Sequence, residues 1–468
     1  MNVGFDVAQA ALDLLRGAGG EPDATPGRLP LRIVGGAPAY DTPHRIVEAC
    51  AAAIAANAIA VEQWWRHCGG AAQHIEIDLL QAAAGLYPVR YQRQNGYPMP
   101  LIPGAELAQD FFETADDRWF YPVASYPALR NRTLEILDCA NTRPALARAI
   151  RKHTGDALED LFALHRIPGA CVRSRAQWLA HPQGQALSRN PTICIRRIAD
   201  SAPVPPPATL PERPLSGLRV LDVSHVIAGP VVARTLAEQG AEALRISAPY
   251  QPDPLVQIMD TGIGKRAAFL DLRQEADTER LRRLCRDADV FIDSWRPGSL
   301  ARRGFSAQDL TRMRPGIIHV SVSTYGSDGP WADRGGFEQI GQLVSGICHT
   351  EGRGGRPRLV PSHFLNDYLT GYLGAAGAAA ALLLRSLHGG SYQVEVSLTG
   401  TSMWVQSLGE QPVPAQPVDP FAIQPVLESR DSPYGKLEQL PPIARFSRTP
   451  ARWDLPPVPL GAHVAAWL

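Results

Sequence analysis

The sequence lacks an excess of charge of either sign. Lys plus Arg and Asp plus Glu each number 46 among 468 residues, so the formal net charge is zero. Binding to nucleic acid or to an anionic membrane surface calls for a basic excess, and we therefore expect neither partner. Hydrophobic residues make up 45% and charged residues 20%, which is typical of a globular protein with one large or two to three ordinary domains.

Paired cysteines are also missing. The seven cysteines are odd in number and none belongs to a CxxC pair, which argues against a disulfide framework and against a zinc site. The first 20 residues carry Asp6 and Asp13 within an apolar pattern and no basic start, unlike a signal peptide. No apolar run reaches a membrane-spanning length without polar interruption. We therefore expect a cytoplasmic protein without a metal centre.

One segment divides the chain. The stretch "SAPVPPPATLPERP" (201–214) holds six prolines, which exclude a helix or a paired strand and predict a linker. Buried strands are predicted after it, with helices between them at 228–241 and 275–288. The strands are predicted at 218–224, 242–247, 267–272, 288–294 and 316–323. This alternation predicts an α/β fold with a doubly wound parallel sheet. The sequence has no GxGxxG, so no nicotinamide or flavin dinucleotide is indicated.

The sequence also contains an internal repeat. Residues 46–81 and 369–400 each read as an Ala-rich helix, a Gly-Gly pair and a strand with alternating acidic and aliphatic residues. The shared pattern favours a duplication, although any two Ala-rich helices are alike to some degree. Only the second helix begins with an aspartate, Asp367 in "NDYLTG" (366–371).

Several motifs, in order along the chain, resemble the family III CoA-transferases, which include formyl-CoA transferase and carnitine CoA-transferase. They are "LSGLRVLDVSHVIAGP" (215–230), "GKRAAFLDL" (264–272), "DSWRPGSLARRGF" (293–305), "SVSTYGSDGPWADRGG" (321–336) and "NDYLTG" (366–371). The resemblance implies a Rossmann-like CoA-binding domain, a smaller α+β domain and an interlocked arrangement of chains.

The order of the resembling parts is unusual. Residues 215–400 resemble the CoA-binding and catalytic domain, and 401–468 resemble the closing segment of the family. Residues 1–200 resemble a trimmed first copy that keeps the central helix and the small domain. The chain therefore resembles two copies joined by the linker, each of them incomplete.

The resemblance implies that Asp367 is the nucleophile. In the family, this aspartate attacks an acyl-CoA to give a mixed anhydride, from which an enzyme-bound CoA thioester forms. Apolar neighbours would desolvate the carboxylate and increase its reactivity, and helix-start amides would favour its ionised form. The alternative from the residues alone is that Asp367 only caps its helix.

The same resemblance implies that CoA or acyl-CoA is bound as a substrate, with no permanently bound cofactor. The matching CoA-binding positions are Ile227, Ala228, Leu270, Asp271, Leu272, Arg273, Ser294, Trp295, Arg296, Arg302, Ser323, Thr324, Tyr325 and Gly326. The guanidinium groups among them suit phosphates. Tyr325 is expected either to orient a reacting oxygen or to pack.

The implied function is transfer of CoA between an acyl-CoA and a small carboxylic acid, and two alternatives stay open. An α-methylacyl-CoA racemase would need a second acid/base group, but Phe337 stands where that family has a histidine. A non-catalytic CoA-binding subunit, partnering an active transferase, would fit the Ser247–Ala248 pair that replaces the family's adenosine-contacting residues. We also expect a homodimer or a complex with a related subunit, because two helices this apolar need partners.

Overall fold

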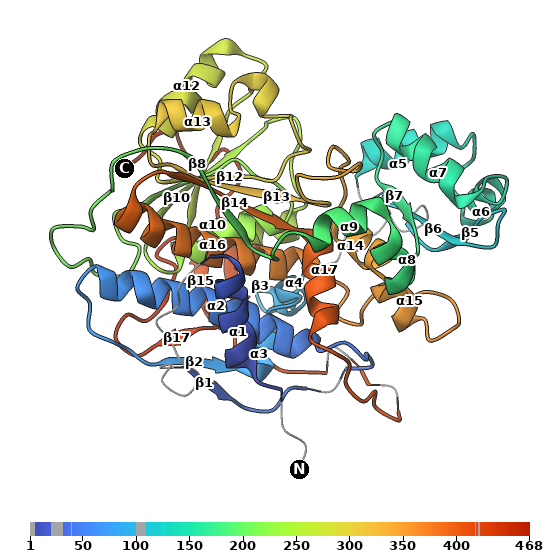
Figure 1. Cartoon of the computed structure of the whole chain (residues 1–468), viewed down its shortest axis with the longest axis horizontal. Coiled ribbons are helices and arrows are strands. Elements are labelled where there is room, and N and C mark those ends of the chain that lie inside the picture. Colours follow the sequence, from blue (N-terminus) through green and yellow to red (C-terminus); the bar gives the residue numbers. More distant parts are fainter. Residues whose placement is uncertain are drawn as a thin grey trace.

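The computed structural model (Figure 1) describes most of the chain. The described residues are 5–19, 31–38, 40–99, 109–124, 126–416, 418–419 and 422–468.

The largest sheet among the described residues has seven strands, in the order β11-β10-β9-β12-β13-β14-β8. They are β8 (Cys194–Ala199), β9 (Arg219–Asp222), β10 (Glu242–Ser247), β11 (Lys265–Phe269), β12 (Val290–Asp293), β13 (Ile318–Ser323) and β14 (Ser391–Ser397). All pairings are parallel except that of β8 with β14. Counted from β9, the parallel strands follow the order 3-2-1-4-5-6 of doubly wound nucleotide-binding folds. The predicted α/β class is confirmed.

Helices cover both faces of this sheet. Neighbouring residues of one strand point to opposite faces and so pack against different helices. Val220 of β9 packs in a core with α10 (Ala228–Ala237) and α16 (Asn366–His388). Leu221, its neighbour, packs in another core with α12 (Glu275–Arg286) and α13 (Ala307–Met313). The connections α11 (Leu255–Thr261), α14 (Glu338–Ser345) and α15 (Ile347–Glu351) complete this half of the molecule.

The internal repeat is present in the fold. The first unit is α2 (Ile46–His67), β2 (Ile75–Asp78) and α3 (Leu79–Ala84), and the second is α16, β14 and α17 (Leu398–Ser407). In the first unit, β2 pairs in parallel with β1 (Leu31–Val34) and antiparallel with β17 (Arg445–Phe446). In the second, β14 pairs in parallel with β13 and antiparallel with β8.

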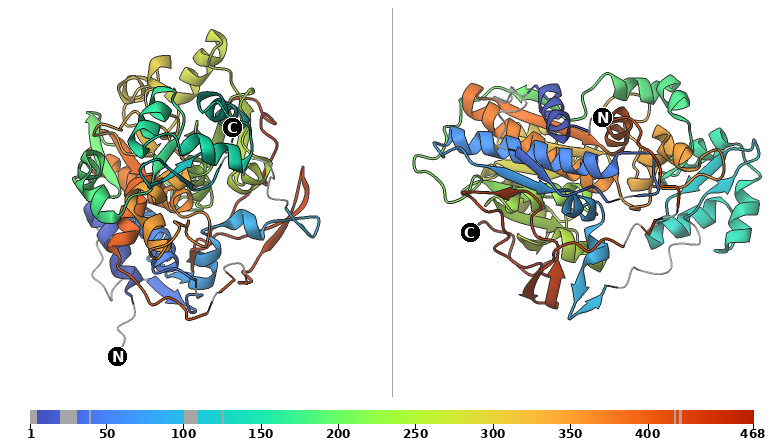
Figure 2. Two further views of the ribbon diagram at one scale, coloured as in Figure 1. Left: turned by 90° about the vertical axis from the view of Figure 1, so that its right-hand side faces the viewer. Right: turned by 90° about the horizontal axis from the view of Figure 1, so that it is seen from below.

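The antiparallel strands are exchanged between the two units. Strand β8 follows the first unit in the chain but pairs with the second, while β17 follows the second unit and pairs with the first. Each unit therefore contributes one strand to the sheet of the other. Their long helices α2 and α16 lie side by side in both projections (Figure 1, Figure 2), with α1 (Val7–Gly17) beside α2.

The helices α2 and α16 are long and apolar enough to cross a membrane, judged by length and composition alone. However, 89% and 83% of their most apolar windows are buried inside the protein, as in core helices. Each helix thus supplies much of the apolar cover that the other needs.

A small α+β unit lies at one end of the molecule, at the right of Figure 1. Its sheet joins β5 (Phe112–Glu113), β6 (Trp119–Pro122) and β7 (Gly169–Cys171), and its helices are α5 (Pro127–Ile136), α6 (Arg143–Ile150) and α7 (Gly155–Leu164). They enclose a core around Phe120 and Phe162. The chain returns through α8 (Arg175–Ala180) and α9 (Pro182–Ser188) to β8.

A further antiparallel sheet joins residues 93–98 to residues 428–439. It consists of β15 (Glu428–Ser432), β16 (Gly435–Gln439), β3 (Arg93–Gln94) and β4 (Tyr97–Pro98). The strands β3 and β4 come directly after the short helix α4 (Pro88–Tyr91). The linker 201–214 contains neither helix nor strand, as its prolines predict.

Candidate active site

A cavity of about 780 Å³ lies between the main sheet and the small unit. It opens at the carboxyl ends of β9, β12 and β13, and β9 and β12 are the neighbours at which the strand order reverses. Ligands of open α/β sheets bind at this switch point, and the volume is in the usual range for ligand pockets. The small unit supplies the opposite wall through residues 126–129, Arg166 and Pro168.

Seven of the predicted site residues line this one cavity. They are Ala228, Ser294, Trp295, Arg296, Ser323, Thr324 and Asp367. They come from the first turn of α10, from the loop after β12, from the end of β13 and the residue after it, and from the first turn of α16. Sequence positions up to 139 residues apart are thus brought to a common site by the parallel sheet.

Two other predicted residues, Arg302 and Tyr325, line an adjoining chamber of about 430 Å³. Arg166 and Arg296 line both spaces, which therefore meet. The side chain of Tyr325 is 3% exposed and its ring packs edge-on against Trp331, with centroids 5.2 Å apart. This geometry fits the packing role that was open for Tyr325.

The remaining predicted CoA contacts lie outside the large cavity. Ile227 is fully buried behind the cavity wall, and Leu270, Asp271 and Leu272 are not among the lining residues. Arg273 is exposed, pairs with the carboxylate of Asp271 at 2.7 Å and lies 3.7 Å from the ring centroid of Tyr250. Tyr250 itself lines the cavity, so Arg273 borders the site through this ring.

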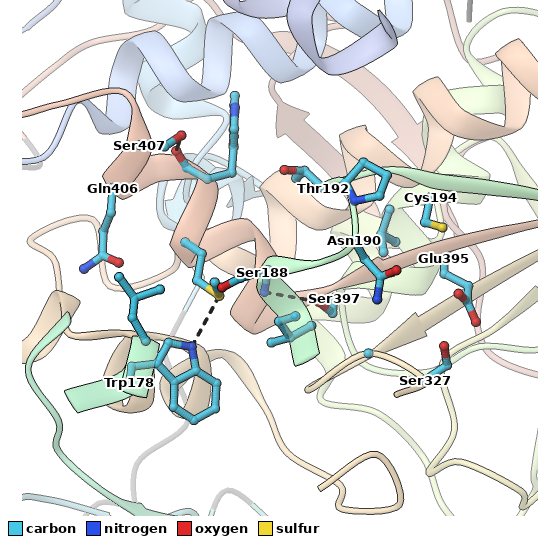
Figure 3. Close-up of a pocket in the computed structure, with 18 of the residues that line it drawn as sticks. Trp178, Ser188, Asn190, Thr192, Cys194, Ser327, Glu395, Ser397, Gln406 and Ser407 are labelled. Carbon is cyan, nitrogen blue, oxygen red and sulfur yellow. Dashed lines mark hydrogen bonds between the residues drawn. The ribbon is translucent and has the colours of Figure 1, made fainter. Parts of the chain in front are cut away.

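Gly326 lines a different pocket, of about 300 Å³, which Figure 3 shows in close-up. Trp178 forms part of its wall and donates its indole N–H to the sulfur of Met403 at 3.3 Å. Hydroxyl and amide side chains such as Ser188 and Asn190 surround the rest. Gly326 therefore does not share a space with Asp367.

Asp367 is buried in the first turn of α16 and is not its N-cap, because Leu365 occupies that position. The main-chain N–H of Asp367 donates to Oε2 of Glu338 at 2.7 Å. The simple capping role is therefore not what the geometry supports. The expectation that helix-start amides stabilise the Asp367 carboxylate also needs correction, since the amide of Asp367 is directed at Glu338.

Glu338 places a second buried carboxyl group beside Asp367. Its side chain is 1% exposed, and its Oε1 accepts the amide of Gln342 at 2.6 Å. Burial and then the neighbouring Glu338 raise the pKa of Asp367 well above its ordinary value, and burial raises the pKa of Glu338. Two neighbouring buried carboxyl groups disfavour a state in which both are ionised.

The turn before α10 is strained and is held by a buried ion pair. Val226 has a φ of +66°, a conformation that β-branched residues rarely adopt. Its N–H donates to Oδ2 of Asp253 at 3.0 Å, and Asp253 also pairs with Arg245. The hydroxyl of Tyr126, from the small unit, donates to Oδ1 of Asp253 at 3.1 Å. Asp253 thus joins the small unit to the turn that lines the cavity.

His225 belongs to an aromatic surface in the cavity rather than to a charged one. Its ring stacks on Trp295 at 4.1 Å and 20°, and Trp295 donates its indole N–H to the carbonyl of Val223 at 2.6 Å. Burial lowers the pKa of His225, which favours the neutral ring.

The sequence analysis missed Glu338, Asp253 and Tyr126. Glu338 is a lone acid beside apolar residues 29 positions before Asp367, and this was a signal that could have been noticed. Asp253 and Tyr126 gain their significance only through contacts between distant segments, and nothing in the local sequence marks them.

Comparison with known proteins gives matches centred on this site. Residues 215–413 match the family model of CoA-transferase family III. The chain is 38% identical to the acetyl-coenzyme A transferase nodX of Hypoxylon pulicicidum over 65% of this chain and 55% of the relative. It is 32% identical to the succinyl-CoA–L-malate CoA-transferase alpha subunit of Chloroflexus aurantiacus over 46% of this chain and 52% of the relative.

The chain thus spans about half the length of these two relatives. The crystal structure of Rv3272 from M. tuberculosis in its orthorhombic form matches with 28% identity over 42% of this chain and 58% of its own. Its TM-score is 0.39, too low for any conclusion about the overall fold.

Proposed function

We propose that this chain, which matches the model of CoA-transferase family III over residues 215–413, transfers CoA between an acyl-CoA thioester and a carboxylic acid, with Asp367 as the nucleophile. The observation that carries this proposal is the position of Asp367. Its buried carboxyl group lies in the large cavity with six other residues of the family's CoA-binding motifs. A desolvated carboxylate is a stronger nucleophile than one in water.

The proposed reaction has two symmetrical halves. The Asp367 carboxylate attacks the thioester carbon of the donor, the C–S bond breaks and a mixed anhydride forms with release of the CoA thiolate. The thiolate then attacks the aspartyl carbonyl, which gives an aspartyl–CoA thioester and frees the donor acid. The acceptor carboxylate repeats both steps in reverse order and leaves as the new acyl-CoA, while Asp367 regains its carboxylate.

Glu338 supports this chemistry by holding the first turn of α16 in place. It accepts the N–H of Asp367 and so fixes the backbone that carries the nucleophile. Asn366 donates its side-chain amide to the carbonyl of Glu338 at 3.1 Å and accepts the hydroxyl of Ser402 at 2.7 Å, which adds two further restraints. We assign CoA phosphate recognition to Arg296 and Arg302, which lie at the junction of the two chambers and beyond it.

The alternatives are less well supported. The Phe337 ring lies 5.8 Å from that of Tyr126 in the cavity wall, and a phenyl group offers no proton for a racemase. A subunit that only binds CoA has no need of two adjacent buried carboxyl groups, which cost stability. A related subunit remains part of the proposal, since one relative is named as an alpha subunit.

The test is covalent trapping. The chain is incubated with acetyl-CoA or succinyl-CoA, treated with hydroxylamine and analysed by mass spectrometry for modification of the peptide that contains Asp367. Asp367→Asn should abolish transfer and trapping while CoA binding survives. The matched control is Asp287→Asn, at an exposed position. More than a few per cent of residual transfer in Asp367→Asn would remove this residue from the mechanism.

A further inference from the structure

The walls of the cavity near Asp367 are mainly apolar. Val322 at the end of β13, Phe337 and Leu398 at the start of α17 line it from the side of the main sheet. Tyr126 and Leu129 line it from the small unit. A substrate that reaches Asp367 therefore lies between hydrocarbon groups from both halves of the chain.

The arginines of this cavity are shared with the adjoining chamber. Among the described lining residues, the arginines are Arg166 and Arg296, and both also line the second chamber. Arg296 donates from Nη2 to the main-chain carbonyl of Arg166 at 2.9 Å, which ties it to that side. The influences on the charge of Asp367 are burial and the acidic Glu338, with no cation among them.

The hydroxyl of Tyr126 already has a hydrogen-bond partner, so this residue lines the cavity mainly through its ring. The hydroxyl is engaged with Oδ1 of Asp253 at 3.1 Å, while the ring faces Phe337 at 5.8 Å and 33°. Tyr126 and Asp367 line the same cavity, so the ring belongs to the space that a substrate of Asp367 would occupy.

We propose that the acid that exchanges CoA at Asp367 is a monocarboxylic acid with an apolar body, and that Tyr126 and Phe337 are the residues that select it. This inference rests on the proposed function and adds its substrate class. The single carboxylate of the acid is consumed at Asp367, and its hydrocarbon part is buried against the two rings. A second carboxylate would be buried against the apolar wall and near the acidic Glu338, where Arg245 is already paired with Asp253.

The test compares acceptors that differ by one carboxylate. Hexanoate is matched with adipate and benzoate with terephthalate, with acetyl-CoA as donor and the full chain as enzyme. We expect kcat/KM for the monocarboxylate to exceed that for its dicarboxylate partner at least tenfold in both pairs. Equal or reversed preference, or trapping at Asp367 without transfer to either monocarboxylate, would overturn the inference while leaving the proposed function intact. Absence of both trapping and CoA binding would instead overturn the proposed function, and this inference with it.

A variant shows whether Tyr126 is the selecting residue. Tyr126→Arg places a cation in the apolar wall and should reduce the ratio of hexanoate to adipate at least fivefold. Tyr126→Phe keeps the ring and should leave that ratio within twofold of the wild-type value, and Tyr97→Arg, at a 76% exposed position, should not change it. An unchanged ratio in folded Tyr126→Arg would remove Tyr126 from substrate selection. If that variant does not fold, a changed ratio in Phe337→Leu supports selection by this wall and an unchanged one overturns it.

Discussion

Two neighbouring carboxyl groups set the protonation of the proposed nucleophile. Asp367 and Glu338 are both buried, and a main-chain hydrogen bond of 2.7 Å connects them. A raised pKa means that the protonated, unreactive form of Asp367 persists to a higher pH than for an exposed aspartate. The fraction of Asp367 that is ionised and reactive therefore increases as the pH rises.

The first prediction follows from the direction of this shift. With wild-type protein, kcat/KM should fall as the pH is lowered, with an apparent pKa above the ordinary aspartate value of 3.8. Glu338→Gln removes the acidic neighbour and should move this acidic limb to lower pH. Glu275→Gln, with a side chain 81% exposed, is the control. A pH–rate profile that is identical in Glu338→Gln and wild type would show that the two carboxyl groups do not interact.

The second prediction separates two arginines that the sequence could not distinguish. Arg302 lines the chamber next to the cavity, so Arg302→Ala should weaken CoA binding by about 1–3 kcal/mol, the range for a charge-assisted hydrogen bond. Arg273 is already paired with Asp271 outside the cavity, so Arg273→Ala should have a smaller effect. Calorimetry at two salt concentrations measures both. Equal affinities for wild type and Arg302→Ala would contradict this placement of the phosphates.

Among single residues, the sequence predicted those within contiguous motifs better than those whose role depends on contacts between distant segments. Asp367, Ser294 and Thr324 lie on contiguous motifs, and the sheet brings them to one cavity. Asp253 and Tyr126 are 127 positions apart and meet only because the small unit folds against the α/β half. Contacts of this kind have no local pattern in a single sequence.

At the scale of elements, the glycines of α16 explain how a nucleophile at a helix start can approach the sheet. A Cβ on Gly371 would lie 2.5 Å from side-chain atoms of Val231 and 2.9 Å from the carbonyl oxygen of Ala228. A Cβ on Gly377 would lie 2.4 Å from Val394 of β14. These glycines allow α16 to pack closely on α10 and on the sheet, although glycine is a poor helix former.

The third prediction uses this packing. Gly371→Ala improves helix propensity but forces α10 and α16 apart, so it should lower the free energy of unfolding by about 1–3 kcal/mol. It should also reduce transfer, since Ala228 lines the cavity. Gly36→Ala, where a Cβ meets nothing within 4 Å, should change the stability by less than about 0.5 kcal/mol. Chemical denaturation measures both, and equal midpoints would contradict close packing at Gly371.

The strands of the α/β half were predictable because each is a short buried run between turn or helix signals. The strand predicted at 242–247 is observed as β10 with the same bounds, whereas the one predicted at 267–272 is observed as β11 (Lys265–Phe269). The apolar residues Leu270 and Leu272 come after Phe269, the last paired residue of β11, so the apolar run does not mark where the strand ends. The pairing of β8 and β17 with distant units could not be predicted from alternation, because pairing partners are chosen by tertiary packing.

At the scale of the whole molecule, the exchange of β8 and β17 holds the two units together. Each strand belongs in sequence to one unit and in space to the other. The helices α2 and α16 find the packing partner that each needs within one chain. Whether chains also associate stays a prediction, which light scattering across a dilution series would decide.

The fourth prediction is that the covalent linker is dispensable once the chain has folded. Residues 206–210 are mostly exposed, so a protease site placed between Ala208 and Thr209 should be accessible. After cleavage, the two fragments should elute together from a sizing column under native conditions and keep most of the transfer activity. The uncut protein, and a sample cut and then denatured, are the controls. Fragments that separate in native buffer would show that the exchanged strands do not hold the units together.

Only one of the two repeated units has an aspartate in the first turn of its long helix, and this sets the expected number of covalent sites per chain. Aligned from their first residues, α2 has Val47 where α16 has Asp367, and its nearby acid Glu48 is paired with Arg45 at 3.5 Å. Among the described residues, the sheet β1-β2-β17 has three strands, whereas the sheet that contains β14 has seven. A titration with acyl-CoA should therefore saturate at one covalent equivalent per chain. The chain contains two repeated units, but only the unit with Asp367 would form the covalent intermediate.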